Sequence, residues 1–290
     1  MTVLDIHAHF EPRMFEVEPM RAQMLSHGVD KVALIPTMND PLPETPTGLL
    51  SFVRALMCSP AHSLANVLQR TFMKDGNLKL KGKIYEIYSE PDNSQVAAVL
   101  RAHPDLFVGW IFLNPRATGD QLQELERWRS EPGYVGVKLH PHWHGWEIPE
   151  GEAIFRRCEE LGLPVLIHLG FGKRGEWQWI AEKFPKLRMI FAHAGMPHFQ
   201  RAWTKMRGYP NLSLDLSSPY LDEALARRAV AAVGSERALY GTDAPYGFHA
   251  EHDHDLYDYS HIKGWVERLP ISSGEIDRVL GVNANELLSL

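Results

Sequence analysis

Eight short apolar segments recur along the chain, most of them ending in a polar side chain or followed by Gly or Pro. They lie at residues 3–9, 31–36, 106–113, 135–140, 165–169, 189–194, 212–216 and 238–243. Such segments, rich in β-branched and large apolar residues, predict buried strands. Helical spacing of apolar residues separates several of them, at 121–128, 152–161, 177–184 and 223–233. Alternating strands and helices predict an α/β fold, and eight such units predict a closed, TIM-like (β/α)8 barrel.

The interval between the second and third predicted strands is too long for a single connecting helix. Residues 37–102 contain several prolines, and helical spacing recurs at 49–57 and 61–73. We therefore expect a cap inserted at about residues 37–102, after the second strand, where it would overhang the active-site mouth. Neither an internal repeat nor a low-complexity linker divides the sequence, so residues 1–290 are expected to form one domain.

Charge and composition restrict the partners and the compartment. The net charge of −6 and the lack of a dense Lys/Arg cluster argue against nucleic acid and membrane partners. The apolar stretches, such as residues 96–100, are far shorter than the roughly 20 residues of a membrane helix. Cys58 and Cys158 cannot form a disulfide framework. With no basic, apolar leader at the N-terminus, a cytoplasmic location is expected.

Strand parity places ionisable side chains on one face of the barrel strands. In residues 3–9, Leu4, Ile6 and Ala8 share one face, and His7 and His9 share the other. On later strands, the face that corresponds to that of His7 and His9 is expected to carry three further ionisable residues near the strand ends: His168, His193 and Asp243. Barrel enzymes place their active sites at these carboxyl ends. The ionisable groups are thus expected to converge inside one barrel mouth, with the apolar sets facing the helices.

A buried group of imidazoles and carboxylates needs a compensating charge, and a divalent cation supplies it. His7 and His9 lie two residues apart on one strand face, about 6 to 7 Å apart at the backbone. Both imidazoles can therefore reach one ion. His168 and Asp243 would complete the set of ligands and leave one position open, as in catalytic zinc sites.

The chain resembles the amidohydrolase superfamily, specifically the amidohydrolase-2 or ACMSD-like branch of metal-dependent hydrolases and non-oxidative decarboxylases. The resemblance rests on motifs in order along the sequence. These are Asp-Ile-His-Ala-His at residues 5–9, Gly-Val-Lys-Leu-His-Pro at 136–141, Ile-His at 167–168, Ala-His-Ala-Gly at 192–195 and Gly-Thr-Asp at 241–243. A lone His-x-His motif is a weak signal, whereas these motifs together, at successive strand ends, are a strong one.

The resemblance implies that one divalent metal, zinc first and manganese as the alternative, is bound by His7, His9, His168 and Asp243. It also implies that His193 lies beside the metal, where His193 and Asp243 would be the catalytic residues that move protons. In some members, a lysine at the fourth strand is carboxylated and bridges two metals. Here His140 lies beyond Lys138, so Lys138 is expected about 6 to 7 Å deeper, as a structural partner of Asp5.

Two reactions use the same ligands. The first hypothesis is a hydrolase that directs metal-activated water at an amide, lactone or related bond of a small molecule. The alternative is a non-oxidative decarboxylase of an aromatic or unsaturated carboxylic acid, and a barrel that binds without turnover is the third. Expected substrate contacts come from His140, Trp143, Trp177 and Asp215, although packing, or a helix cap for Asp215, would also explain these residues.

Four basic side chains are the candidates to bind a substrate carboxylate: Arg54, Arg70, Lys173 and Arg174. The His- and Asp-rich run at residues 249–255 is a weaker candidate for a second ion, and a hydrated loop explains it better. The family resemblance also predicts a homodimer.

Overall fold

Eight parallel strands form one sheet that follows the chain order. The computed structural model describes residues 2–14, 16–43, 45–90, 92–246 and 259–290. The strands are β1 (Leu4–His9), β2 (Lys31–Ile35), β6 (Phe107–Phe112), β7 (Tyr134–Leu139), β8 (Val165–Ile167), β9 (Met189–Phe191), β10 (Leu212–Asp215) and β11 (Ala238–Leu239). Each one pairs in parallel with its neighbour, from β1 and β2 through to β10 and β11.

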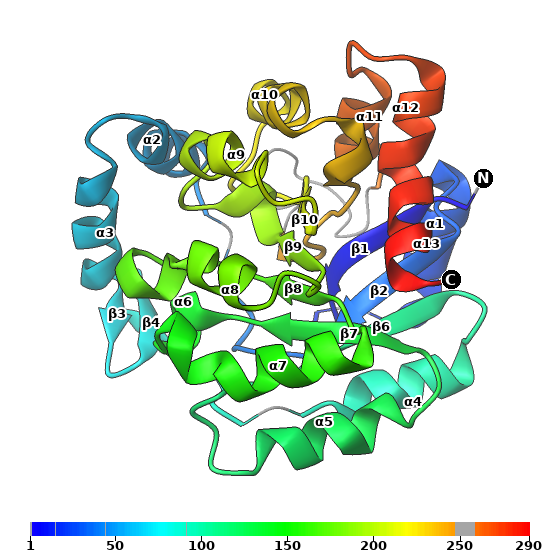
Figure 1. Ribbon diagram of the computed structural model, residues 1–290, viewed down its shortest axis with the longest axis horizontal. Helices are drawn as coiled ribbons and strands as arrows, with labels where there is room; N and C mark the ends of the chain where they lie inside the picture. The colour runs from blue at the N-terminus through cyan, green and yellow to red at the C-terminus, as the bar shows by residue number, and fades with distance from the viewer. Residues whose placement is uncertain (1, 15, 44, 91, 247–258) are drawn as a thin grey trace.

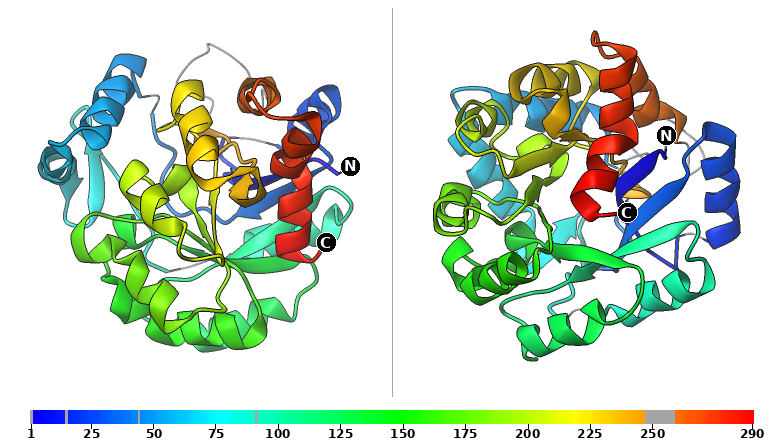
Figure 2. Two further views of the ribbon diagram at one scale, coloured as in Figure 1. Left: turned by 45° about the horizontal axis from the view of Figure 1, so that its top comes forward. Right: turned by 45° about the vertical axis from the view of Figure 1, so that its right-hand side comes forward.

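The residues that follow β11 close this sheet onto β1. Ile6 N donates to Tyr240 O at 3.1 Å, and Asp243 N donates to His7 O at 2.6 Å. A parallel bridge joins Ala8 to Ala244. The predicted TIM-like (β/α)8 barrel is thereby confirmed, and Figures 1 and 2 show its strands ringed by helices.

The helices between successive strands cover the outside of the barrel. They are α1 (Val17–His27), α4 (Ser94–Ala102), α5 (Gln121–Arg129), α7 (Glu152–Leu161), α8 (Trp177–Lys183), α9 (Gln200–Met206) and α10 (Glu223–Val233). Local chemistry sets several of their ends. Asp120 and Asp222 cap α5 and α10 through side-chain oxygens that accept from backbone N–H groups. Gly28 and Gly162 end α1 and α7 in the left-handed conformation.

The C-terminal segment packs across one end of the barrel. It contains α11 (Ser260–Glu267), α12 (Ser273–Asp277), a π-helical turn (Arg278–Val282) and α13 (Asn283–Leu288). Asn283 donates to the backbone oxygens of Ser235 and Ala238, which joins this segment to the start of β11. The two chain ends lie near each other (Figure 2), and Asn285 donates to Thr2 O at 3.2 Å.

The interval after β2 folds into two helices and a small antiparallel sheet, which we call the cap. It comprises α2 (Thr47–Cys58), α3 (His62–Thr71), β3 (Met73–Lys74), β4 (Asn77–Leu80) and β5 (Lys83–Tyr85), and stands at one edge of the molecule (Figure 1). Helix α4 belongs to the barrel instead, because its Val96 and Leu100 pack directly on Gly109 of β6. The range 37–102 expected from sequence therefore includes one barrel helix as well as the cap.

One apolar cluster combines residues from most barrel strands and fills the interior. Leu4 and Ile6 of β1 belong to it, together with Trp110, Leu166 and Ile190. Parity had predicted that Leu4 and Ile6 face the helices, and that prediction is wrong. The register of β1 against β2 shifts between Asp5 and Ala8. Such a bulge inserts a residue and exchanges the two faces.

Strand β9 departs from the expected parity for a different reason. Ile190 and Ala192 face the barrel interior, whereas Phe191 packs outward beside Trp177. Strict alternation would have directed His193 outward with Phe191. The strand ends at Phe191, however, and His193 adopts φ 51° and ψ 49° in the left-handed region. That backbone turn brings the His193 side chain back to the barrel mouth.

None of the helices in the described part of the chain combines the length and the apolar character that a bilayer crossing requires.

Candidate functional site

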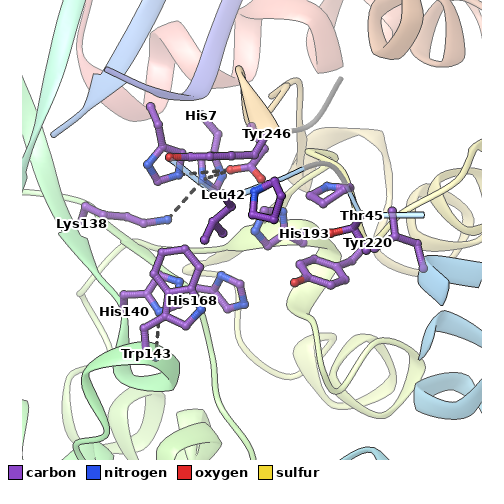
Figure 3. A pocket seen from close by; sticks show the side chains of 15 residues that line it. His7, Leu42, Thr45, Lys138, His140, Trp143, His168, His193, Tyr220 and Tyr246 are labelled. Atoms are coloured by element: carbon purple, nitrogen blue, oxygen red, sulfur yellow. Dashed lines mark hydrogen bonds and ion pairs between the residues drawn. The ribbon is translucent and has the colours of Figure 1, made fainter. Parts of the chain in front are cut away.

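A pocket with an open volume of about 630 Å³ lies at the carboxyl ends of the strands, beneath the start of the cap. Figure 3 shows Trp143, His140 and His168 on one side and Thr45 and Tyr220 on the other. The lining comprises His7, His9, Leu42, Pro43, Thr45, Leu50, Lys138, His140, Trp143, His168, His193, Pro219, Tyr220, Asp243 and Tyr246. All four ligands expected from sequence, and His193, therefore line one pocket.

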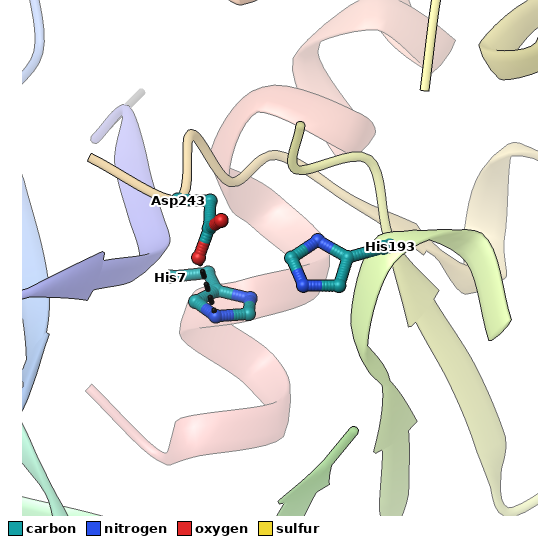
Figure 4. Close-up of side chains that lie close together, drawn as sticks. All are labelled: His7, His193 and Asp243. Atoms are coloured by element: carbon teal, nitrogen blue, oxygen red, sulfur yellow. Dashed lines mark ion pairs between the residues drawn. The ribbon is translucent and has the colours of Figure 1, made fainter. Parts of the chain in front are cut away.

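Three of these side chains approach one another most closely. One ligand atom each from His7, His193 and Asp243 lies within 4.8 Å of the other two, and all three residues are buried. Figure 4 shows the Asp243 carboxylate pointing towards the His7 ring, with the His193 ring facing both. His9 joins this group because its Nε2 lies 3.2 Å from Asp243 Oδ1. The closest group thus includes His193, which the sequence analysis had placed beside the ligands.

His168 approaches the group from β8. Its ring centre lies 4.7 Å from that of His193 and 4.2 Å from that of His140. Its Nε2 is buried and has no hydrogen-bond partner within the described residues, and the same holds for His9 Nδ1. An orphaned buried imidazole nitrogen is costly unless something compensates it. A divalent cation bound by nitrogen and carboxylate donors fits this pocket.

Burial and neighbouring groups set the protonation of the cluster. Burial lowers the pKa of His9 to about 4 and that of His193 to about 4. Burial alone would raise the pKa of Asp243, but the nearby histidines outweigh it and hold this pKa well below its usual range. At neutral pH the site therefore presents neutral His9 and His193 beside an ionised Asp243, the forms that bind a metal.

Asp215 does not lie where a substrate contact was expected. It is fully buried beneath the pocket, where its Oδ2 accepts from His7 Nδ1 at 2.8 Å. Its Oδ1 accepts from the backbone N–H groups of His193 at 2.9 Å and Ser217 at 3.0 Å. Because β10 lies between β9 and β11 in the sheet, the carboxylate at its end reaches both His193 after β9 and His7 of β1, and holds them in place. Its position corresponds to a positioning residue instead of a substrate-binding one.

The two tryptophans expected to contact the substrate lie in different places in the structure. Trp143 lines the pocket, and its ring stacks on His140 with centres 4.4 Å apart and planes 18° apart. Trp177 instead packs outside the barrel, with its ring centre 5.3 Å from that of Phe191 and 5.6 Å from that of Tyr209. It begins helix α8, so its side chain points to the strands that α8 covers. The expected contact between Trp177 and substrate does not match this placement.

Lys138 also differs from its predicted place. It lines the pocket, and its Nζ lies 3.3 Å from His7 Nε2 instead of one layer below the ligands. The long, flexible side chain spans the distance that the backbone position implied. Asp5 is satisfied otherwise, because it accepts from Thr242 Oγ1 at 2.5 Å and from Thr242 N at 3.1 Å. Burial lowers the pKa of Lys138 to about 8.

Several residues in or beside the pocket carry no motif that predicts their place. Ser217 Oγ lies 2.8 Å from His193 Nδ1, and its only sequence signal is its place just after β10. Tyr220 and Tyr246 line the pocket from loops that carry no motif. The run at residues 249–255, considered for a second ion, lies outside the described residues.

Comparison with known proteins identifies the family to which this chain belongs. The model of the amidohydrolase family matches residues 4–290, almost the whole chain. The chain belongs to the amidohydrolase family. This confirms the resemblance inferred from the strand-end motifs, and the chain is an enzyme of the amidohydrolase superfamily.

Three relatives illustrate its range. A 2-amino-3-carboxymuconate-6-semialdehyde decarboxylase from Dictyostelium discoideum is 26% identical over 130 residues, which cover 36% of each chain, so only about a third of that relative is matched. A dihydroxybenzoic acid decarboxylase from Polaromonas, with bound manganese and the inhibitor 2-nitroresorcinol, has a TM-score of 0.61 at 16% identity, covering 100% and 97% of the two chains. A putative 2-pyrone-4,6-dicarboxylic acid hydrolase from Pseudomonas putida has a TM-score of 0.64 at 18% identity, covering 99% and 97%.

Likenesses this distant establish the fold alone, and these relatives are named for both reaction types. Several of the relatives are named as decarboxylases. One neighbour holds manganese, and zinc is not specifically indicated.

Proposed function

We propose that this chain is a metal-dependent, non-oxidative decarboxylase of a small aromatic or unsaturated carboxylic acid. One observation carries the proposal: a flat wall, made by Trp143 stacked on His140, borders the same pocket as the buried histidine–aspartate cluster. A planar acid fits against such a wall, since aromatic faces prefer offset stacking. The recurrence of decarboxylases among the relatives supports the same choice.

The metal would be held by His7, His9, His168 and Asp243. His193 lies close enough to His7 and Asp243 to be a further ligand. A bound divalent ion would polarise the substrate oxygens and stabilise negative charge as the carbon–carbon bond breaks. Lys138 would bind a carboxylate or phenolate oxygen, because a pKa of about 8 leaves its ammonium mostly protonated at neutral pH. The stacked Trp143 would keep the acid planar and exclude water from one face.

Loss of CO2 leaves an electron pair on the ring or vinyl carbon, and a proton must take the place of the carboxylate. His193 and Asp243 face the pocket close to each other and are the candidates to deliver it. Because both are deprotonated at neutral pH, the one that delivers the proton would first take it from an acidic O–H group of the substrate or from water. His193 is held for this role, because its backbone N–H donates to Asp215 and its Nδ1 lies 2.8 Å from Ser217 Oγ. This leaves Nε2 of His193 free to face the substrate.

Hydrolysis is the second candidate, favoured by the likeness to the putative 2-pyrone-4,6-dicarboxylic acid hydrolase. The same residues would then direct water at a lactone or amide carbon and protonate the leaving group. The two reactions differ in their products, so one panel of compounds separates them.

The test uses protein reconstituted with manganese or zinc in turn. Hydroxylated benzoic acids, unsaturated acids, lactones and amides are incubated in D2O, and both CO2 release and acid release are measured. We expect CO2 in proportion to substrate consumed, with deuterium on the carbon that lost the carboxylate. Acid release from a lactone or amide without CO2 would establish the hydrolase instead.

A further inference from the structure

A second cavity, which we call the apolar chamber, lies between the cap and the barrel. Its open volume is about 990 Å³, and α2, α3 and β4 supply most of its lining. Phe171 and Met196 close it from the barrel side. Val53, Ala65 and Leu68 are typical of the side chains that face it, which are mainly aliphatic.

The chamber continues the metal pocket. Leu42, Thr45, Leu50, Trp143 and Tyr220 line both cavities, so the two share a common boundary. Trp143 is held at this boundary by its stacking on His140. A molecule bound at the cluster therefore meets the chamber directly beyond the aromatic wall.

The proposed reaction takes place in the metal pocket and leaves the chamber without a role. Both hollows are partly open to solvent, with open volumes of about 630 Å³ for the pocket and about 990 Å³ for the chamber. Apolar surface in contact with water is unfavourable, and a contiguous exposed apolar surface often marks a ligand-binding groove. Leu49 and Leu68, both in the lining, remain 40% and 37% exposed. An apolar ligand group in the chamber would cover them.

Basic side chains border one edge of the chamber. An adjoining hollow shares Gln69, Met73, Trp143 and Phe171 with it. The basic residues of this hollow are Arg70, Arg116, Lys173 and Arg174.

Two of these cations are paired with carboxylates. Arg116 pairs with Glu150, and Lys173 pairs with Glu147. Arg174 contacts the backbone oxygen of His142 at 3.5 Å, so positive charge remains in excess at this edge. Partial burial, with Arg116 and Arg70 nearby, lowers the pKa of Arg174 from its ordinary value.

We propose that the substrate is an elongated acid: its reacting carboxylate lies at the histidine–aspartate cluster, an apolar substituent fills the chamber, and an anionic group at the far end meets Arg174. This inference rests on the proposed function for the reacting end only. The chamber and its basic edge are independent of which bond is broken.

The experiment measures binding by calorimetry to the manganese-loaded enzyme. The probes are 2-nitroresorcinol and derivatives with a straight tail opposite the nitro group, about two to eight carbons long, ending in methyl or carboxylate. Affinity is expected to rise about threefold with each methylene until the chamber is filled. Carboxylate tails long enough to reach the basic edge should bind at least as tightly as methyl tails.

Chamber-filling variants provide the structural control. Val53→Phe and Leu68→Trp should each weaken the longest tails at least tenfold and leave 2-nitroresorcinol unchanged, whereas Leu25→Trp, on exposed α1, should alter neither. Arg174→Gln should weaken only the carboxylate tails, about fivefold to tenfold, with Arg101→Gln as its matched control.

Equal affinity for tailed and untailed probes would overturn the chamber as a binding site. Carboxylate tails weaker than methyl tails at every length would overturn the anionic end. The reaction is scored separately. If untailed acids release CO2 and a tail does not raise affinity, the proposed function is supported and this inference is overturned. If a tail raises affinity and no acid releases CO2, this inference is supported and the proposed function is overturned.

Discussion

The Asp215 carboxylate accepts a hydrogen bond from His7 Nδ1 at 2.8 Å, and both side chains are fully buried. Because Nδ1 is the nitrogen that donates to Asp215, His7 Nε2 faces the pocket, 3.2 Å from Asp243 Oδ1, and is the nitrogen with which His7 would bind a metal. The same carboxylate accepts from the backbone N–H of His193. One side chain therefore sets the ring orientation of an expected ligand and the backbone position of the expected proton donor.

Replacing Asp215 with Asn should weaken metal binding about 10- to 100-fold, because the amide no longer fixes His7 in the required tautomer. Competition with a chromogenic chelator measures the affinity. Asp120→Asn, which alters a carboxylate at the exposed N-terminus of α5 and keeps its capping ability, is the matched control. Unchanged affinity in Asp215→Asn would contradict the positioning role.

His9→Ala and His193→Ala should separate the ligand role from the proton-transfer role. We expect His9→Ala to lose metal and activity together. His193→Ala should retain stoichiometric metal and lose about 10²- to 10⁴-fold in kcat. Elemental analysis of both purified variants gives the metal content. Loss of metal from His193→Ala would make His193 a ligand, as its closeness to His7 and Asp243 allows.

Thr242→Val should destabilise the fold by about 1–3 kcal/mol, because it leaves the buried Asp5 carboxylate without its side-chain donor. Burial raises the pKa of Asp5 to about 7, with the Thr242 hydroxyl opposing that shift. Urea unfolding of chelator-treated protein measures the loss without a contribution from bound metal. Thr204→Val, on an exposed helix face, should change stability by less than about 0.5 kcal/mol.

Gly136→Ala should destabilise the barrel by about 1–3 kcal/mol through overpacking. A Cβ there would lie 2.6 Å from Pro164 O and 2.6 Å from the Trp110 ring. Pro164 O accepts the Val137 N–H, so it cannot move away without weakening the contact between β7 and β8. Gly48→Ala, where a Cβ meets nothing within 4 Å, should be neutral or slightly stabilising. Thermal unfolding compares the two.

Glu223 should contribute a small pH-dependent stability. Hydrogen bonds from Arg268 and Arg227 lower its pKa from 4.5 to about 2. The contribution is therefore complete above about pH 4.5 and is lost as the pH falls towards 2. Because both arginines are substantially exposed, Glu223→Gln should cost less than about 1 kcal/mol. Urea unfolding at pH 7, 5 and 3 measures the difference in unfolding free energy between the variant and the unaltered protein. This difference should shrink as the pH falls. A difference that stays constant would exclude the ion pairs as its source.

The fold could be predicted because its signals are local. Each barrel strand is a short apolar segment, and eight in parallel order leave few alternatives to a closed barrel. The same reasoning predicted the cap, as an interval too long for one helix. Its small antiparallel sheet was missed, because β3, β4 and β5 are short and mix polar with apolar residues. The end of the cap was misplaced, since α4 has the spacing of any amphipathic helix.

The site could be predicted only in part. His7, His9, His168, His193 and Asp243 stand in recognisable motifs and meet in one pocket. Trp143 and Trp177 both follow barrel strands in the sequence, yet only Trp143 of the two lines that pocket. Trp177 begins α8, which packs on the outside of the barrel. Asp215 resembles any acidic residue at a strand end. Its role depends on His7, 208 positions away in sequence.

The sequence by itself determined the strand order, the class of enzyme and the residue types at the barrel mouth, because strand periodicity and short motifs are properties of neighbouring residues. Tertiary structure alone decided which way several side chains face. The bulge in β1 reverses the alternation between Ile6 and His7, and the left-handed backbone of His193 redirects a side chain that alternation would place outside. Both departures from ideal geometry need support from packing and hydrogen bonds across the closed barrel, such as those from Asp215 and residues 240–244, which no local pattern encodes.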